Sequence, residues 1–250
     1  MQKLSLAKAK QIKGLHQKKI REETNLFLVE GAKPVLELLV SDWKIEMLVI
    51  SNSFYGDCQN VILEIAHKVF VCSEDELSQI STFKTNNKAL AVVSKKTPNQ
   101  TGPGETADLW LVLDGIADPG NLGTIIRLAD WFGLQEVITI GDGVEWYNPK
   151  VIAASMGSFL RINQVKTDAS NLLLSDRKPF VADLNGTSLY DFTFPEKSML
   201  VIGNEAKGPS EIWKKNGVQS ITIPAFGQAE SLNAGIATGI FLNHYRFRKI

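Results

Sequence analysis

The polar residues with which this chain could do chemistry gather in or beside three loops, at residues 114–121, 203–210 and 224–233. Each loop follows a short apolar run of the kind that forms a buried strand. In open α/β sheets, ligands bind in loops at the carboxyl ends of parallel strands. The polar side chains in or beside these loops include amides, a hydroxyl, a carboxylate and a guanidinium: Asn121, Arg127, Glu205, Ser231 and Asn233.

These side chains suit a reaction that depends on hydrogen bonding and charge stabilisation. Asn and Ser side chains give directional hydrogen bonds, and Glu205 can accept from a hydroxyl, a backbone N–H or a guanidinium. Arg127 falls in the helical pattern that follows the first loop, close enough to its start to reach toward that loop. The simpler alternatives are a surface arginine at an ordinary strand–loop–helix junction and, for Ser231, a helix N-cap.

Familiar nucleotide-binding motifs are absent from the sequence or incomplete. It holds no G-x-G-x-x-G, so a dinucleotide site of the Rossmann type is not supported. The loop 203–210, GNEAKGPS, nearly matches the phosphate loop G-x-x-x-x-G-K-S/T, but Pro209 stands where the phosphate-binding Lys belongs. Glu205 would also place a negative charge among phosphates. An ATPase or GTPase is therefore disfavoured.

The composition is that of an ordinary globular protein. The chain has 250 residues, of which 44% are hydrophobic, and its 27 basic residues balance 27 acidic ones. Net charge therefore argues neither for nor against nucleic acid. The basic residues that precede the first acid, Glu22, are Lys3, Lys8, Lys10, Lys13, Lys18, Lys19 and Arg21. This run is either a solvated helix face or a patch that contacts phosphates, through Lys18, Lys19 and Arg21 among others.

Cysteine and histidine usage predicts no metal site. Cys58 and Cys72 lack metal-type spacing, and the three histidines are scattered. The first segment lacks the apolar core of a signal peptide, and no later run is long enough to span a membrane. We therefore expect a cytoplasmic protein.

Turn-forming residues divide the chain into two predicted domains. Residues 1–96 alternate strands with helices, among them a helix over residues 4–20, and residues 97–106, TPNQTGPGET, form a predicted linker. In residues 107–250, predicted strands again alternate with helices, including one over 149–159 and a last one over 231–247. Strands separated by helices need crossover connections, so the second sheet should be largely parallel.

The three loops closely resemble the three motifs of the SpoU (TrmH-type) RNA 2'-O-ribose methyltransferases of the SPOUT superfamily. The matching stretches are DPGNLGTIIR, GNEAKGPS and IPAFGQAESLNAG. KKIREETNLFLVEGAKPVLELL resembles the substrate-binding domain of members that modify rRNA. Two departures, Ala225 for a usual Met and Ala234-Gly235 for a usual Val-Ser, concern details of the cofactor pocket.

This resemblance implies an α/β protein with a small N-terminal RNA-binding domain and a C-terminal, mostly parallel-sheet SPOUT domain with a deep trefoil knot. It also implies S-adenosylmethionine, held around Gly203, Gly208, Ile223, Leu232 and Asn233, and a homodimer. The last helix carries an apolar stripe, Ile236, Ile240, Phe241 and His244, which would lie either at that interface or in the helix's own core.

The implied reaction is an attack of a ribose 2'-OH on the sulfonium methyl. The resemblance makes Asn121, Arg127, Glu205, Ser231 and Asn233 the candidate catalytic residues. Arg127 is the one expected closest to the chemistry, either stabilising charge or passing a proton onward. The implied partner is RNA, with large-subunit rRNA favoured. A tRNA target and a non-catalytic RNA-binding module of the same fold stay as alternatives.

Overall fold

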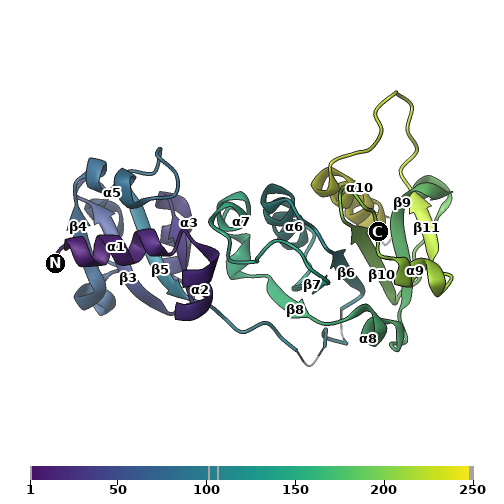
Figure 1. Cartoon of the computed structure of the whole chain (residues 1–250), viewed down its shortest axis with the longest axis horizontal. Helices are drawn as coiled ribbons and strands as arrows, with labels where there is room; N and C mark the ends of the chain where they lie inside the picture. Colours follow the sequence, from purple (N-terminus) through teal and green to yellow (C-terminus); the bar gives the residue numbers. More distant parts are fainter. Residues whose placement is uncertain (1, 101, 106, 248–250) are drawn as a thin grey trace. The chain divides into compact units, whose positions relative to one another are not determined.

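The computed structural model describes residues 2–100, 102–105 and 107–247, which fall into two compact units (Figure 1). The first unit comprises the chain up to Thr97 together with Tyr147–Leu160, and the second comprises Pro98–Trp146 and the chain from Arg161 onward. Residues 147–160 thus depart from the predicted division, which assigned them to the second domain.

Aromatic packing explains why this later segment joins the first unit. The ring of Phe27 lies with its centroid 4.6 Å from that of Tyr147 and 5.9 Å from that of Phe159. The Trp43 ring also packs edge-on against both of these later rings. Contacts between residues so far apart in sequence leave no local signal, so composition alone could not reveal them.

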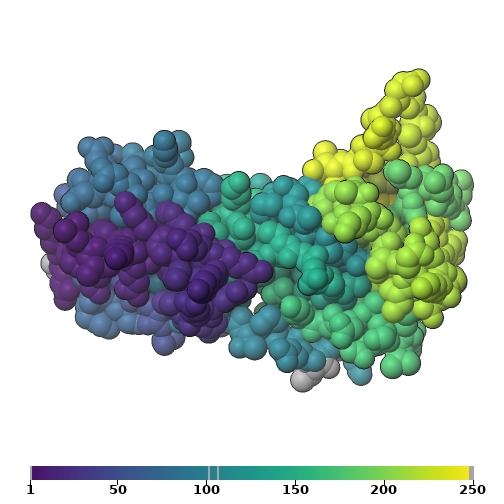
Figure 2. Space-filling model, in the orientation of Figure 1, coloured from purple at the N-terminus to yellow at the C-terminus, as the bar shows by residue number. Residues whose placement is uncertain are grey.

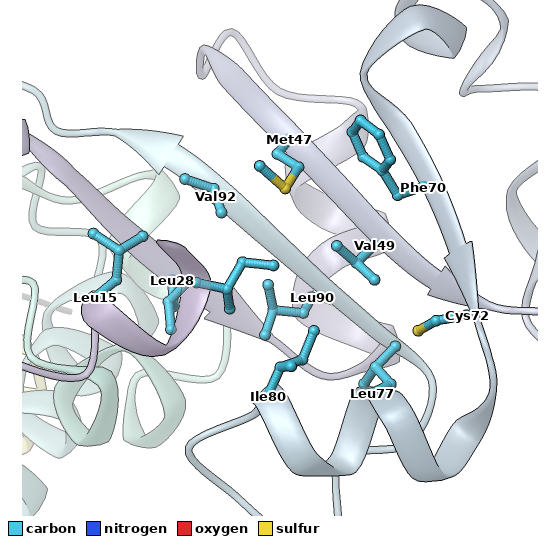
Figure 3. Packing of buried hydrophobic residues seen from close by; sticks show 11 residues of the cluster. Leu15, Leu28, Met47, Val49, Phe70, Cys72, Leu77, Ile80, Leu90 and Val92 are labelled. Atoms are coloured by element: carbon cyan, nitrogen blue, oxygen red, sulfur yellow. The ribbon is translucent and has the colours of Figure 1, made fainter. Parts of the chain in front are cut away.

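The first unit is a five-stranded mixed sheet in the order β1-β4-β3-β5-β2, in which β2 and β3 run antiparallel to β5. Its strands are β1 (Gln2–Lys3), β2 (Leu26–Glu30), β3 (Ile45–Ser51), β4 (Val69–Cys72) and β5 (Ala89–Ser94). Its helices are α1 (Leu6–Gly14), α2 (Lys18–Thr24), α3 (Ala32–Leu39), α4 (Tyr55–Cys58), α5 (Glu74–Ile80) and α7 (Pro149–Ala154), with 3₁₀ turns at Leu63–Lys68 and Ser158–Leu160. Leu28, Val49 and Leu90 face Leu77 and Ile80 of α5 in its core (Figure 3).

The predicted helix over residues 4–20 is divided into α1 and α2, because the Arg21 side chain donates hydrogen bonds to backbone carbonyls where the helix breaks. Its Nη1 donates to the carbonyl oxygens of Leu15 at 2.8 Å and His16 at 2.9 Å. In an unbroken helix these carbonyls would accept from backbone N–H groups four residues later. The Arg21 side chain is only 2% exposed. The prediction that Arg21 contacts RNA phosphates is therefore corrected, because its guanidinium is buried and binds backbone carbonyls of the protein.

The second unit is a six-stranded sheet in the order β11-β9-β10-β6-β7-β8, and every pairing in it is parallel, as predicted. Its strands are β6 (Leu109–Asp114), β7 (Glu136–Ile140), β8 (Asn163–Lys166), β9 (Lys178–Ser188), β10 (Ser198–Gly203) and β11 (Gln219–Thr222). Its helices are α6 (Pro119–Trp131), α8 (Ala169–Leu173), α9 (Glu211–Lys215) and α10 (Ala234–Phe247), with a 3₁₀ turn at Leu189–Asp191. Leu172 of α8 and Trp213 of α9 join the core on one face, while α6 and α10 pack against each other and contact β7 and β10.

Helix α6 begins at Pro119, earlier than its apolar spacing indicates. The Asp118 carboxylate accepts from the backbone N–H of Asn121 at 2.7 Å, and Pro119 occupies the first position, where no N–H is needed. Gly133 follows the helix at φ +70° and closes it, as the sequence predicts. Asn121 therefore lies in the first turn of α6, and Arg127 lies about two turns from its start.

The predicted linker is docked on the second sheet over part of its length. The Asn99 N–H donates to Gln164 O at 3.0 Å, and the Asn99 carbonyl accepts from Lys166 N at 3.1 Å. Trp110 Nε1 also donates to Gly104 O at 3.1 Å. Residues 101 and 106 of the linker lie outside the described residues. The turn-forming composition therefore indicates the boundary between the domains, but the described part of this segment is held by hydrogen bonds to the second unit.

We predict that Arg21→Ala lowers the free energy of unfolding by about 2–3 kcal/mol, because two backbone carbonyls lose a charged donor. Lys19→Ala is the matched control on the same helix, since the Lys19 side chain is 80% exposed and should contribute less than about 0.5 kcal/mol. Urea unfolding followed by circular dichroism measures both changes. Equal effects of the two substitutions would contradict a structural role for Arg21.

Candidate active site

Three loops that are far apart in sequence meet through a chain of hydrogen bonds. Asn233 Nδ2 donates to Asn121 Oδ1 at 2.6 Å, and Asn121 Nδ2 donates to Glu205 Oε1 at 2.7 Å. Asn121 is 6% exposed, so both ends of its amide are committed within the protein. The first, second and third loops thus each supply one member of a single cluster.

Glu205 also accepts from the backbone that leads into α6. Its carboxylate oxygens lie 3.2 Å from Ala117 N and 3.4 Å from Asp118 N. Partial burial raises the pKa of Glu205, but the hydrogen bonds from Asn121 and these N–H groups outweigh it, and the net pKa is lowered from 4.5. Glu205 is therefore a carboxylate at neutral pH, suited to accept hydrogen bonds.

The turn that carries Glu205 doubles back closely on itself. Asn204 N donates to Gly208 O at 3.1 Å, and Gly208 N donates to Asn204 O at 2.9 Å. A Cβ on Gly203 would lie 2.3 Å from Pro209 N, so only glycine fits there. Gly208 has a φ of +68°, which glycine adopts without strain.

Asn233 begins the last helix. Its Oδ1 accepts from Gly235 N at 2.9 Å and Ile236 N at 3.2 Å, so Asn233 caps α10 while its Nδ2 contacts Asn121. The alternative that Ser231 is the N-cap is wrong, because α10 begins three residues after it. Ser231 is exposed, and no hydrogen bond joins it to another described residue.

The segment between β11 and α10 projects from the second unit (Figure 2). Among the described residues, no hydrogen bond engages the backbone of residues 224–232. Within it Phe226 is 98% exposed and Leu232 is 47% exposed, while Ile223, just before it, is half-buried. Free N–H and C=O groups beside apolar side chains fit a ligand that has both a flat heterocycle and polar ends.

Arg127 lies on the exposed side of α6. In the part of the chain that the structure describes, its guanidinium has no hydrogen bond or ion pair. It follows Asn121 by six positions, so it lies along the same helix as the cluster without joining it. Such a cation remains available for an anion from outside the chain.

Sequence reasoning missed two polar residues that hold the turn 203–210. Asp114, at the end of β6, accepts from Ser210 and Trp213, and Asn204 Nδ2 donates to Gly115 O at 2.8 Å. A carboxylate that directly follows five apolar residues is the one signal that could have singled out Asp114.

Neither a metal centre nor a membrane helix is present in the described part of the chain. There, no three His, Cys, Asp or Glu side chains gather to hold a metal ion. Over the same residues, every helix is too short or too polar to cross a bilayer.

Known proteins resemble the chain over almost its whole length. A model of the SpoU rRNA Methylase family matches residues 108–243, and one of the MRM3-like substrate binding domain matches residues 7–91. The 23S rRNA (guanosine(2553)-2'-O)-methyltransferase RlmP of Bacillus subtilis is 31% identical over 245 residues, which is 96% of each chain. The 23S rRNA (uridine(2479)-2'-O)-methyltransferase of Streptomyces viridochromogenes is 26% identical and covers 91% of this chain and 85% of its own.

The fold is shared with solved structures. An AdoMet-bound rRNA methyltransferase from Sinorhizobium meliloti superposes with a TM-score of 0.88 at 27% identity, covering 100% of this chain and 98% of that one. An RNA methyltransferase of the TrmH family from Porphyromonas gingivalis, described as putative in its source, gives 0.80 at 30% identity over 98% and 99% of the two chains.

We predict that Glu205→Gln weakens the acid sensitivity of stability. A carboxylate with a lowered folded pKa stabilises the fold above its unfolded pKa, and this contribution is lost as pH falls through the folded value, which lies below 4.5. At neutral pH the substitution should cost about 0.5–1 kcal/mol, because solvent screens the partly exposed group. Thermal melts from pH 7 to pH 3 measure the difference, and parallel curves for the two proteins would refute it.

Proposed function

Because the chain belongs to the SpoU rRNA Methylase family, we propose that it transfers a methyl group from S-adenosylmethionine to a ribose 2'-OH of large-subunit ribosomal RNA. The observation that carries the proposal is the hydrogen-bonded cluster of Asn121, Glu205 and Asn233, which joins the three family motifs. The first of these motifs also carries Arg127, which pairs with no other described residue. Relatives that match most of the chain carry the name of 23S rRNA 2'-O-methyltransferases.

The cofactor would be held around Gly203, Gly208, Ile223, Leu232 and Asn233. The fit rests on the unpaired backbone of residues 224–232, which offers donors and acceptors for an adenine edge, and on half-exposed apolar side chains for its faces. S-adenosylmethionine supplies an electrophilic methyl when bound. In the turn 203–210, Gly203 lets the chain pack against Pro209, and the space beside the Cα of Gly208 is open, so a ligand can approach the backbone there.

The chain's own contribution to the reaction is mainly positioning. A ribose oxygen must approach the methyl in line, so fixed hydrogen-bonding groups lower the entropic part of the barrier. Arg127 stays protonated at ordinary pH and is therefore poorly suited to be a general base. It would bind a phosphate next to the target ribose and stabilise the negative charge that develops on the 2' oxygen as the hydroxyl proton leaves to water. The O–CH₃ bond would form as the S–CH₃ bond breaks, and S-adenosylhomocysteine would be the leaving group.

Lys18 and Lys19 on α2 are proposed to contact RNA phosphates. Both side chains are well exposed, and each pairs only loosely with an acid one turn later, Lys18 with Glu22 at 3.6 Å and Lys19 with Glu23 at 3.8 Å. Exposed pairs of this kind are weak, so a phosphate can replace the acid at little cost. Residues 7–91, which include both lysines, also match the model of the MRM3-like substrate binding domain.

Two further expectations stay predictions, namely the trefoil knot and the homodimer. The apolar stripe of α10 is divided in the structure, because Phe241 is 2% exposed whereas Ile236 is 57% exposed. Ile236 is therefore the part of the stripe that a second copy could cover.

A tRNA target and a non-catalytic RNA-binding module stay as alternatives to the proposed function. The non-catalytic module is disfavoured because Asn121, Arg127, Glu205 and Asn233 are all present.

The proposal predicts one S-adenosylmethionine site per chain and methyl transfer to rRNA. Isothermal calorimetry with the purified protein should show that stoichiometry. Labelled methyl should enter 23S rRNA at a 2'-O position, which is mapped by the resistance of the adjacent phosphodiester bond to alkaline hydrolysis. Binding without transfer to any RNA would favour the non-catalytic module. Label found in tRNA instead would favour the tRNA alternative.

Arg127→Ala should lower turnover by roughly a hundredfold or more, the scale for losing one charge-stabilising group. The affinity for S-adenosylmethionine should not change, and Arg127→Lys should recover little, because an ammonium lacks the forked donors. Arg161→Ala is the control, since Arg161 is another exposed arginine of the second unit, paired with Asp130. Near wild-type turnover of folded, cofactor-binding Arg127→Ala would remove Arg127 from the mechanism.

A further inference from the structure

Asp114 is a buried carboxylate with all its hydrogen bonds on one oxygen. Asp114 is the last residue of β6, and it is 7% exposed. Oδ2 accepts from Ser210 N at 2.7 Å, from Ser210 Oγ at 2.7 Å and from Trp213 Nε1 at 2.9 Å. A buried charge is tolerated only where such donors compensate for lost water. The three donors therefore set where this carboxylate and its partners lie.

The partners of Asp114 stand at the far end of the turn that carries Glu205. Ser210 is the last residue before α9, and Trp213 lies within α9 and is fully buried. At the near end of the same turn, Asn204 Nδ2 donates to Gly115 O at 2.8 Å. Both ends of the turn are thus tied to two consecutive residues at the end of β6.

The other contacts of this turn hold mainly its first half, through Glu205 and through the backbone pair of Asn204 and Gly208. The ladder of β10 does not extend into residues 204–210. Helix α9 has five residues, too few to hold its own position without tertiary contacts, and it is anchored by the core packing of Trp213 and by the bonds to Asp114. These bonds are the polar contacts that tie the second half of the turn to the end of β6.

We infer that Asp114 is a positioning residue that acts through Ser210 and Trp213 to hold the turn 203–210 in the form that binds S-adenosylmethionine. This inference rests on the proposed function, because that turn supplies Gly203 and Gly208 to the cofactor site. Asp114 acts on cofactor affinity, whereas Arg127 acts on turnover once the cofactor is bound.

The substitution Asp114→Asn keeps the shape and removes the charge. The amide oxygen of Asn is neutral, so all three donors lose a charge-assisted hydrogen bond, and the NH₂ group can only donate. Trp213→Phe removes only the Nε1 donor to Asp114 and keeps most of the apolar volume of the side chain. Both should loosen the turn while leaving the strands of the sheet in place.

Trp110→Phe is the matched control. Trp110 is also a nearly buried tryptophan of the second unit, and its Nε1 also donates one hydrogen bond, to Gly104 O. It lies near the opposite end of β6 from Asp114. A general loss of stability in this unit should therefore affect Trp110→Phe and Trp213→Phe alike, whereas a loosened turn should affect only the second.

The test measures cofactor affinity by calorimetry, steady-state methyl transfer and backbone hydrogen exchange in the ligand-free protein. We expect Asp114→Asn and Trp213→Phe to raise Kd and KM for S-adenosylmethionine about tenfold, the scale for losing a hydrogen bond to a charged group. Turnover at saturating cofactor should change much less. Amide exchange should accelerate in residues 204–210 of both variants, and Trp110→Phe should show neither effect.

An unchanged Kd together with unchanged exchange in residues 204–210 would overturn the inference, as would a Kd raised equally by Trp110→Phe. If Asp114→Asn does not fold, Trp213→Phe carries the same comparison. If the wild-type protein binds no S-adenosylmethionine, the proposed function falls and the cofactor part of the inference falls with it. Exchange in residues 204–210 then still decides whether Asp114 holds the turn.

Discussion

The parallel pairing of β6 with β10 is the constraint on which the site depends. In its register Asp114 stands beside Gly203, so the two strands end together at one edge of the sheet. The loops that follow them must therefore start side by side, although about 90 positions separate them in sequence. Only then can Asn121, at the start of α6, reach the carboxylate of Glu205 at 2.7 Å.

Two carboxylates at this edge have different surroundings and different effects. Asp114 is buried and takes its donors from α9 and the residue before it, so it fixes backbone. Glu205 is partly solvated and takes its donors from Asn121 and from the entry to α6, where the helix dipole also favours a negative charge. One carboxylate sets the distance between secondary-structure elements, and the other sets the orientation of side chains.

The sequence predicts those parts of the fold that depend on local chemistry. Gly133 at the end of α6 and the apolar runs of the second sheet are such cases, because a positive φ or a buried strand leaves a mark on neighbouring residues. The sequence points to Asn233 as a site residue and offers Ser231, two positions earlier, as a possible N-cap, whereas in the structure Asn233 caps α10. Both residue types cap helices, so spacing alone could not separate them.

Long-range contacts explain where the sequence was insufficient. Arg21 looked like one more member of a basic run, and only the fold reveals the carbonyls of Leu15 and His16 that it bonds. In the same way, Phe27 draws Tyr147 and Phe159 into the first unit by ring packing. A side chain's polarity can be read from the chain, but its partners depend on which distant segment is folded against it.

The unpaired state of Arg127 is consistent with the function proposed for it. Two carboxylates of the loops that form the site already have donors, Glu205 from Asn121 and backbone, and Asp114 from Ser210 and Trp213. An arginine that formed a close ion pair with either of them would have to break it before binding a phosphate, and the cost would weaken RNA binding. Because those acids take other donors, Arg127 would have no ion pair with them to break before it bound the phosphate that we propose as its partner.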